Sequence, residues 1–208
     1  QIAEGSMLPS GKMPYEVFIP AYRDEILSDT VMVYGNVDEV ELVLNGKTIR
    51  RQTADKGPDS DYIPVPNGGN GKNLHFPPFT FYGVPKERGV LKAVGYHQGK
   101  KVAEYTVKTP GVPERLDITY FESGKPATKN DLLIVYVRML DKQGVLCPVN
   151  GIPVELSVQG GEIVGPTSYP LEAGVASFLV RTGEISKINI NATGKGFSTR
   201  KSLKVGKE

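Results

Sequence analysis

Residues 33–47, which read Val-Tyr-Gly-Asn-Val-Asp-Glu-Val-Glu-Leu-Val-Leu-Asn-Gly-Lys, decide the fold class of this chain. Valine and leucine alternate with glutamate from 39 to 42, and a period of two places apolar side chains on one face of a strand and carboxylates on the other. Asn45 and Gly46 follow, and this pair supplies the positive φ angles of a tight hairpin turn. The stretch therefore predicts a β-hairpin with a half-buried first strand, and nothing in it indicates catalysis.

The composition agrees with a β-rich protein. The chain has 208 residues, of which 39% are hydrophobic, with 24 glycines and 16 prolines, as expected for many short strands joined by turns. The charge is nearly balanced, with 25 basic and 23 acidic residues, so we expect no nucleic acid as a partner. No apolar run approaches the roughly 18 residues that span a membrane. A single cysteine excludes an internal disulfide and a cysteine metal site, and we expect no cofactor.

A proline-rich segment, Thr109-Pro110-Gly111-Val112-Pro113, suggests a boundary between two domains. Prolines lack the backbone donor that strand pairing needs, so this segment suits a short, stiff connection. The expected organisation is an N-terminal extension over 1–13, a β-sandwich over 14–109, a linker over 110–113 and a second β-sandwich over 114–208.

Strand patterns fill both halves of the chain, and no window shows a helical period. In the second half, alternation over 133–139 and 176–180 and a turn at 141–144 indicate about seven short strands, the pattern of an immunoglobulin-like sandwich. In the first half, 62–65 is expected to form a strand and 58–73 a long exposed loop rich in glycine, proline, asparagine and aspartate. We therefore predict an all-β chain of two tandem immunoglobulin-like β-sandwich domains.

Glu39 and Glu41 are the first candidates for chemistry. They point the same way from one strand, about 7 Å apart, which superficially suits the carboxylate pair of a glycosidase. A solvent-facing strand offers no burial to raise the pKa of one of them, as general acid catalysis requires. We interpret both as an ordinary solvated face and predict no catalytic residue in this chain.

Asp55, Asp59 and Asp61 are weak candidates for a calcium site, because they place carboxylate oxygens in an expected flexible loop. Their spacing matches no known calcium loop, so a solvated loop is the favoured interpretation.

Aromatic residues gather beside prolines at 74–82. Tyr62, His75, Phe76 and Tyr82 are candidates for a sugar-stacking platform or for contact with another domain. The alternative is structural, with the phenylalanines of 79–81 in the core and Phe76 fixing the loop. The chain lacks tryptophan, the usual sugar-stacking residue, which weakens the carbohydrate interpretation.

Ordered motifs of the first half resemble the segment that follows the catalytic barrel in family 2 glycoside hydrolases of the β-galactosidase type. Gly35 departs mildly from the serine usual in that family. The second half resembles a bacterial Ig-like domain, although invasin-like adhesins share its cues at 131–137, 141–144 and 154–158. The matching first-half segments are 14–20, 33–47, 77–81 and 89–96.

The resemblance implies a C-terminal, non-catalytic region of a larger enzyme. Its parent would be a retaining β-glycosidase, most simply a β-galactosidase, located in the periplasm or outside a bacterial cell. The implied partner is the catalytic barrel of the same parent chain, and carbohydrate is the second candidate partner. A carbohydrate-binding module and an Ig-like adhesin or cell-surface interaction domain stay open as alternatives.

Overall fold

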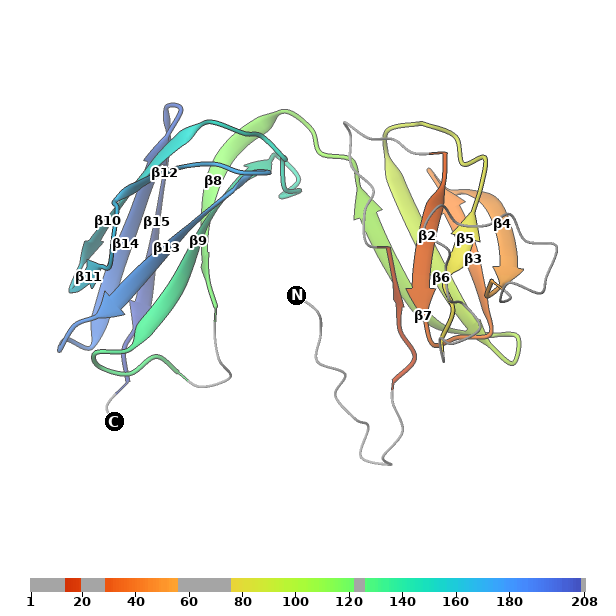
Figure 1. Ribbon diagram of the computed structural model, residues 1–208, viewed down its shortest axis with the longest axis horizontal. Helices are drawn as coiled ribbons and strands as arrows, with labels where there is room; N and C mark the ends of the chain where they lie inside the picture. The colour runs from red at the N-terminus through yellow and green to blue at the C-terminus, as the bar shows by residue number, and fades with distance from the viewer. Residues whose placement is uncertain (1–13, 20–28, 56–75, 122–125, 207–208) are drawn as a thin grey trace. The chain divides into compact units, whose positions relative to one another are not determined.

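The computed structural model describes residues 14–19, 29–55, 76–121 and 126–206, and all regular secondary structure within them is β-strand. The chain divides into two compact units, Gln1–Thr109 and Pro110–Glu208. Each unit consists of two facing layers of strands (Figure 1). This architecture confirms the predicted all-β fold of two immunoglobulin-like sandwiches. Across the same residues, no helix is long and apolar enough to cross a membrane.

In the first unit, a three-stranded sheet in the order β1-β2-β5 faces a four-stranded sheet in the order β4-β3-β6-β7. All strand pairs in it are antiparallel. The strands are β1 (Val17–Phe18), β2 (Val31–Gly35), β3 (Glu39–Leu44), β4 (Lys47–Thr53), β5 (Phe79–Phe81), β6 (Val90–His97) and β7 (Lys100–Lys108).

The predicted hairpin is present as β3 and β4. Asn45 and Gly46 form the turn between them, with φ angles of 51° and 81°. A register shift between Leu42 and Val43 marks a bulge in the pair. Because β3 also pairs with β6, it lies inside the sheet, and its alternation places alternate residues in the core.

The core of the first unit lies between its two sheets. Val40 and Leu42 are fully buried from β3, and Phe79 and Phe81 are fully buried from β5. Burial of one such side chain stabilises the fold by about 1.5–3 kcal/mol. The core interpretation of the two phenylalanines is therefore confirmed.

The second unit repeats the architecture with two four-stranded sheets, in the orders β11-β13-β9-β8 and β12-β10-β14-β15. The strands are β8 (Pro113–Tyr120), β9 (Leu132–Asp141), β10 (Pro153–Gln159), β11 (Gly161–Ile163), β12 (Ser168–Pro170), β13 (Val175–Thr182), β14 (Lys187–Gly194) and β15 (Phe197–Lys204).

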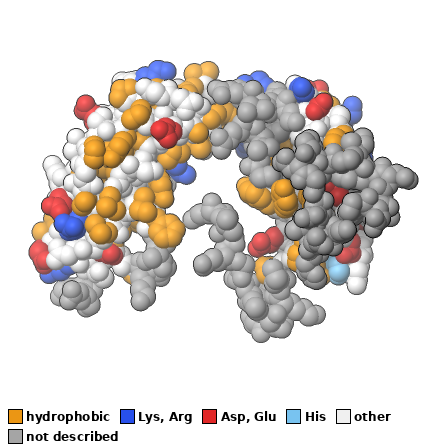
Figure 2. All heavy atoms as spheres, viewed as in Figure 1, with side chains coloured by type: hydrophobic (Ala, Val, Ile, Leu, Met, Phe, Trp, Pro, Cys, Tyr) orange, Lys and Arg blue, Asp and Glu red, His pale blue; other side chains and the backbone are white. Residues whose placement is uncertain are grey.

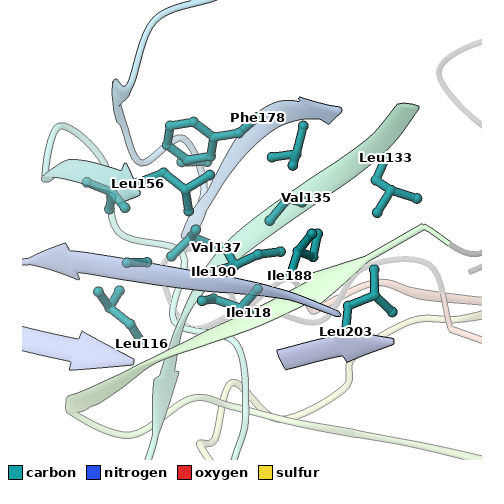
Figure 3. Close-up of a cluster of buried hydrophobic side chains, with 14 of the residues drawn as sticks. Leu116, Ile118, Leu133, Val135, Val137, Leu156, Phe178, Ile188, Ile190 and Leu203 are labelled. Atoms are coloured by element: carbon teal, nitrogen blue, oxygen red, sulfur yellow. The ribbon is translucent and has the colours of Figure 1, made fainter. Parts of the chain in front are cut away.

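Figure 3 shows the core of this second unit, where side chains from both sheets point toward one another. Val135 and Val137 of β9 are fully buried, as are Ile188 and Ile190 of β14 in the facing sheet. The alternation predicted over 133–139 and 176–180 matches the burial of β9 and β13.

Two details differ from expectation or extend it. Strand β12 was not predicted, because its three residues lie among prolines, which argue against a strand inside a sheet. Prolines are tolerated in edge strands, and β12 lies at the edge of its sheet. The turn after β9 is present and is closed by Asp141, whose side chain accepts hydrogen bonds from Val145 N at 2.8 Å and Gly111 N at 2.7 Å. The strand expected at 62–65 and the loop expected at 58–73 lie outside the described residues.

Candidate functional site

The family-like motifs of the first unit contact one another through their polar side chains. Asn36 accepts a hydrogen bond from Glu16 N at 2.6 Å and donates one to Pro14 O at 2.7 Å. This side chain therefore fixes the segment that leads into β1 against the start of the 33–47 motif. Gly35 is required beside it, because a Cβ at that position would lie 2.6 Å from Glu16 O.

Two further residues of the 33–47 motif bind the ends of β6. Asp38 accepts a hydrogen bond from Gln98 N at 2.7 Å and pairs with His97 Nδ1 at 3.0 Å, at the β6–β7 turn. Asn45 accepts from Val90 N at 2.9 Å at the other end of β6 and donates to Arg88 O at 3.1 Å. The motif residues thus hold neighbouring strands in register.

Glu39 and Glu41 lie half-buried on the outer face of the β4-β3-β6-β7 sheet, where neighbouring strands provide partners. Arg51 Nη2 lies 2.6 Å from Glu39 Oε2, and its guanidinium lies 3.7 Å from the ring centroid of Tyr96. Glu41 accepts hydrogen bonds from Thr48 Oγ1 and Tyr96 Oη, both at 2.7 Å. One network therefore joins three strands of the sheet.

The electrostatics of this network oppose a role in proton donation. The hydroxyl of Thr48, and then that of Tyr96, lower the pKa of Glu41 below its ordinary value. The same contact raises the pKa of Tyr96. A general acid of a glycosidase must hold its proton near neutral pH, which needs a shift in the opposite direction. The arrangement keeps Glu41 ionised and suits a structural role.

Of the three candidates for calcium, Asp55 lies among the described residues, whereas Asp59 and Asp61 lie outside them. Both carboxylate oxygens of Asp55 accept hydrogen bonds from Thr80, at 3.1 Å from its backbone N and 2.5 Å from its Oγ1. Gln52 Nε2 donates to Thr80 O at 2.9 Å. Asp55 thus ties β5 to the end of β4 in the facing sheet. Within the described ranges, no group of three or more histidine, cysteine or acidic residues is placed to hold a metal ion.

The aromatic candidates are divided in the same way. Phe76 is 47% exposed just before β5, and Tyr82 is half-buried just after it. Tyr62 and His75 lie outside the described residues. The structure therefore brings Phe76 and Tyr82 to the two ends of one short strand.

A second aromatic group was not singled out in the sequence. Phe18 and Tyr34 are exposed cross-strand partners on β1 and β2, and the ring of Phe18 meets that of Tyr105 edge-on at 5.0 Å. Tyr15 stacks on His97 with ring centroids 4.7 Å apart. We call these five residues the β1 aromatic surface. Alternate residues along 15–19 point to opposite faces of the strand. With Val17 in the core, this alternation would have identified Phe18 as outward-facing.

Comparison with known proteins finds a matching domain family and several similar β-galactosidases. The family described as a domain of unknown function, DUF4982, matches residues 28–103. A β-galactosidase of Thermoanaerobacter pseudethanolicus is 30% identical over 176 residues, which are 79% of this chain and 22% of that protein. A β-galactosidase sequence of Rhizobium radiobacter is 30% identical over 129 residues, 61% of this chain and 92% of its own length.

Solved structures share the fold. A β-glycosidase from Bacteroides vulgatus superposes with a TM-score of 0.71 at 16% identity, over 94% of this chain and 25% of that one. A β-glucuronidase from glycoside hydrolase family 2 gives 0.70 at 22% identity, over 93% of this chain and 20% of that one. The chain spans about a fifth of the length of the first curated relative. The chain therefore belongs to the family 2 glycoside hydrolases of the β-galactosidase type, as a non-catalytic accessory region built from two β-sandwiches.

Proposed function

We propose that this accessory region supports and positions the catalytic barrel of a β-galactosidase-like enzyme, without performing hydrolysis itself. The observation that carries the proposal is the state of Glu41, which Thr48 and Tyr96 hold as a hydrogen-bonded carboxylate. The family-like motif serves to assemble the sandwich, so the reacting carboxylates belong to another part of the enzyme. Export to the periplasm or cell surface of a bacterium is part of this proposal and rests on the resemblance.

The β1 aromatic surface is the proposed contact with the barrel. Exposed aromatic rings are enriched at protein interfaces, because they bury much area at little entropic cost. Phe18 and Tyr34 lie side by side, and Asn36 fixes the segment leading into β1 through Glu16 and Pro14. The surface is therefore held in one conformation before any partner arrives.

Two measurements test the proposal. The isolated chain should release no product from aryl β-galactosides, and clear turnover would contradict the proposal. In the full-length enzyme, the double variant Phe18→Ser/Tyr34→Ser should lower the inactivation temperature of galactosidase activity. Val102→Ser, a change at an exposed residue of β7, is the control and should leave that temperature unchanged. Equal loss in both variants, or in neither, would contradict a contact at β1.

Carbohydrate binding is a second candidate, favoured by one corner of the first unit. Tyr15 is 40% exposed with its ring stacked on His97, and the carboxylate of Asp38 lies beside that imidazole. A sugar can stack on an aromatic ring face and donate hydrogen bonds to a carboxylate beside it. Calorimetric titration with galacto-oligosaccharides should show millimolar or tighter binding that Tyr15→Ala abolishes, and the absence of heat would exclude this candidate.

A further inference from the structure

A row of apolar side chains crosses the outer face of the β11-β13-β9-β8 sheet in the second unit. Ile134 of β9 pairs with Leu179 of β13. Phe121 N donates to Ile134 O at 2.9 Å on one side, and Val164 N donates to Leu179 O at 2.8 Å on the other. These four residues, which we call the apolar row, therefore form one continuous line across the sheet.

The row is open to solvent. Phe121 is 59% exposed, Ile134 43%, Val164 37% and Leu179 36%, and neighbouring Leu132 is 51% exposed. Hydrophobic side chains also gather over the second unit in the space-filling view (Figure 2). The inner residues of the same strands already fill the core, so the fold of the unit does not require these outer side chains.

The charged groups nearest the row form ion pairs. Arg181 pairs with Glu162 on the Leu132 side of the row. Arg138 Nη2 lies 2.5 Å from Asp117 Oδ2 on the other side, beyond Tyr136. The face thus carries one basic and one acidic group at each end and no net charge from these pairs. A strongly charged partner, such as a nucleic acid or an anionic lipid surface, gains nothing from it.

We infer that this face binds the same face of a second copy of the chain, forming a two-fold symmetric dimer. An isologous interface needs a patch that is complementary to itself. A face with net charge would place like charges opposite each other, whereas this one places an apolar row against an apolar row. Each end carries one charge of each sign in a closed pair, so two copies bring no net like charge of these pairs together in either direction. The inference does not depend on the proposed contact at β1 or on the proposed function.

The size of the face places the dimer among weak complexes. Four strands and eight residues give a sheet roughly 19 Å wide and 27 Å long, or roughly 500 Å² per copy. This is below the roughly 800 Å² per partner of a standard stable interface. We therefore expect the dimer to be weak and transient.

Sedimentation velocity across a concentration series tests the inference. The chain should shift from monomer to dimer as its concentration rises, and Leu179→Lys should raise the Kd at least about tenfold, because it buries a charge in the apolar row. Val102→Lys is a matched control, since Val102 is also 36% exposed on the outer side of a strand in the first unit, and its Kd should not change. A monomer at every concentration, or equal weakening by both variants, would overturn the inference.

Cross-linking locates the interface directly. Ser177 lies beside Leu179 on the outer side of β13, and Ser157 is exposed on β10 in the opposite sheet. A short bis-maleimide should link Ser177→Cys into dimers and leave Ser157→Cys monomeric, while native Cys147 is buried at 2% exposure. Dimers from Ser157→Cys alone, or from neither variant, would show that the apolar row is covered by something else and would overturn the inference.

Discussion

The outer faces of two sheets in this chain differ in the kind of side chain that they present to solvent. In the first unit, the outer face of the β4-β3-β6-β7 sheet is polar, and Glu39, Arg51, Tyr96 and Glu41 satisfy one another across three strands. In the second unit, the outer face of the β11-β13-β9-β8 sheet carries the apolar row, whose side chains have solvent on one side. The polar groups of the first face find their partners within the chain. On the second face, removing the apolar side chains from water is favourable, so covering that face lowers the free energy.

The difference between the two outer faces bears on how the family-like segments of the sequence are interpreted. The residues that carry the resemblance make contacts within their own unit, so they report the fold and its ancestry. Leu179 and Phe121 of the apolar row lie outside the segments that carry a resemblance, whereas Ile134 of the same row lies within one of them. Phe18 and Tyr34, the proposed contact at β1, also lie within such segments. A resemblance in sequence therefore does not by itself identify which residues of this chain form an interaction surface.

The largest expected effect on stability comes from the buried side of β3. Leu42→Ala removes a fully buried side chain of β3 and should lower the free energy of unfolding of the first unit by about 2–5 kcal/mol. Denaturant unfolding followed by NMR of both units measures this change. The second unit should keep its own midpoint, and a common shift of both would contradict independent cores.

Next in size is Asp141, the carboxylate that closes the turn after β9. Burial alone would raise its pKa, but hydrogen bonds from the backbone N–H groups of Gly111 and Val145, with smaller contributions from residues 143 and 144, bring it below the ordinary value. Because the folded pKa is the lower one, this stabilisation is present above about pH 4 and is lost as the pH falls through the folded pKa.

Asp141→Asn should therefore lower the stability of the second unit by about 1.5–3 kcal/mol at neutral pH, as for hydrogen bonds to a charged acceptor. Thermal unfolding at pH 7 and at pH 2 measures the difference between variant and parent. The difference should shrink at the lower pH, and a constant difference would exclude a role for the charge.

The smallest effects contrast the two outer faces directly. Tyr96→Phe removes the hydroxyl that donates to Glu41 and should cost the first unit about 0.5–1.5 kcal/mol. Leu179→Thr, on the apolar row, should change the stability of the second unit by no more than about 0.5 kcal/mol, yet weaken self-association. If Leu179→Thr destabilised the monomer more than Tyr96→Phe, the comparison between the two faces would be wrong.

Much of the fold was predictable, because alternation and turn residues act locally. The β3–β4 hairpin follows from Asn45-Gly46, and burial along β9 follows from its period of two. The partners of Glu41 were not predictable, since Tyr96 lies 55 residues away and meets it only through the pairing of β3 with β6. The apolar row was missed for the same reason, because Phe121, Ile134 and Leu179 are brought together by strand order.

The central claim is that the carboxylates of the family-like motif hold structure and perform no acid–base chemistry. The most direct test is a titration of the Glu41 side-chain carboxyl by ¹³C NMR, with Tyr96→Phe as the matched control. The hydroxyls of Thr48 and Tyr96 should hold the pKa of Glu41 below the ordinary glutamate value, and Tyr96→Phe should move it partly back toward that value. A pKa of Glu41 raised above the ordinary value, as a general acid requires, would contradict the claim.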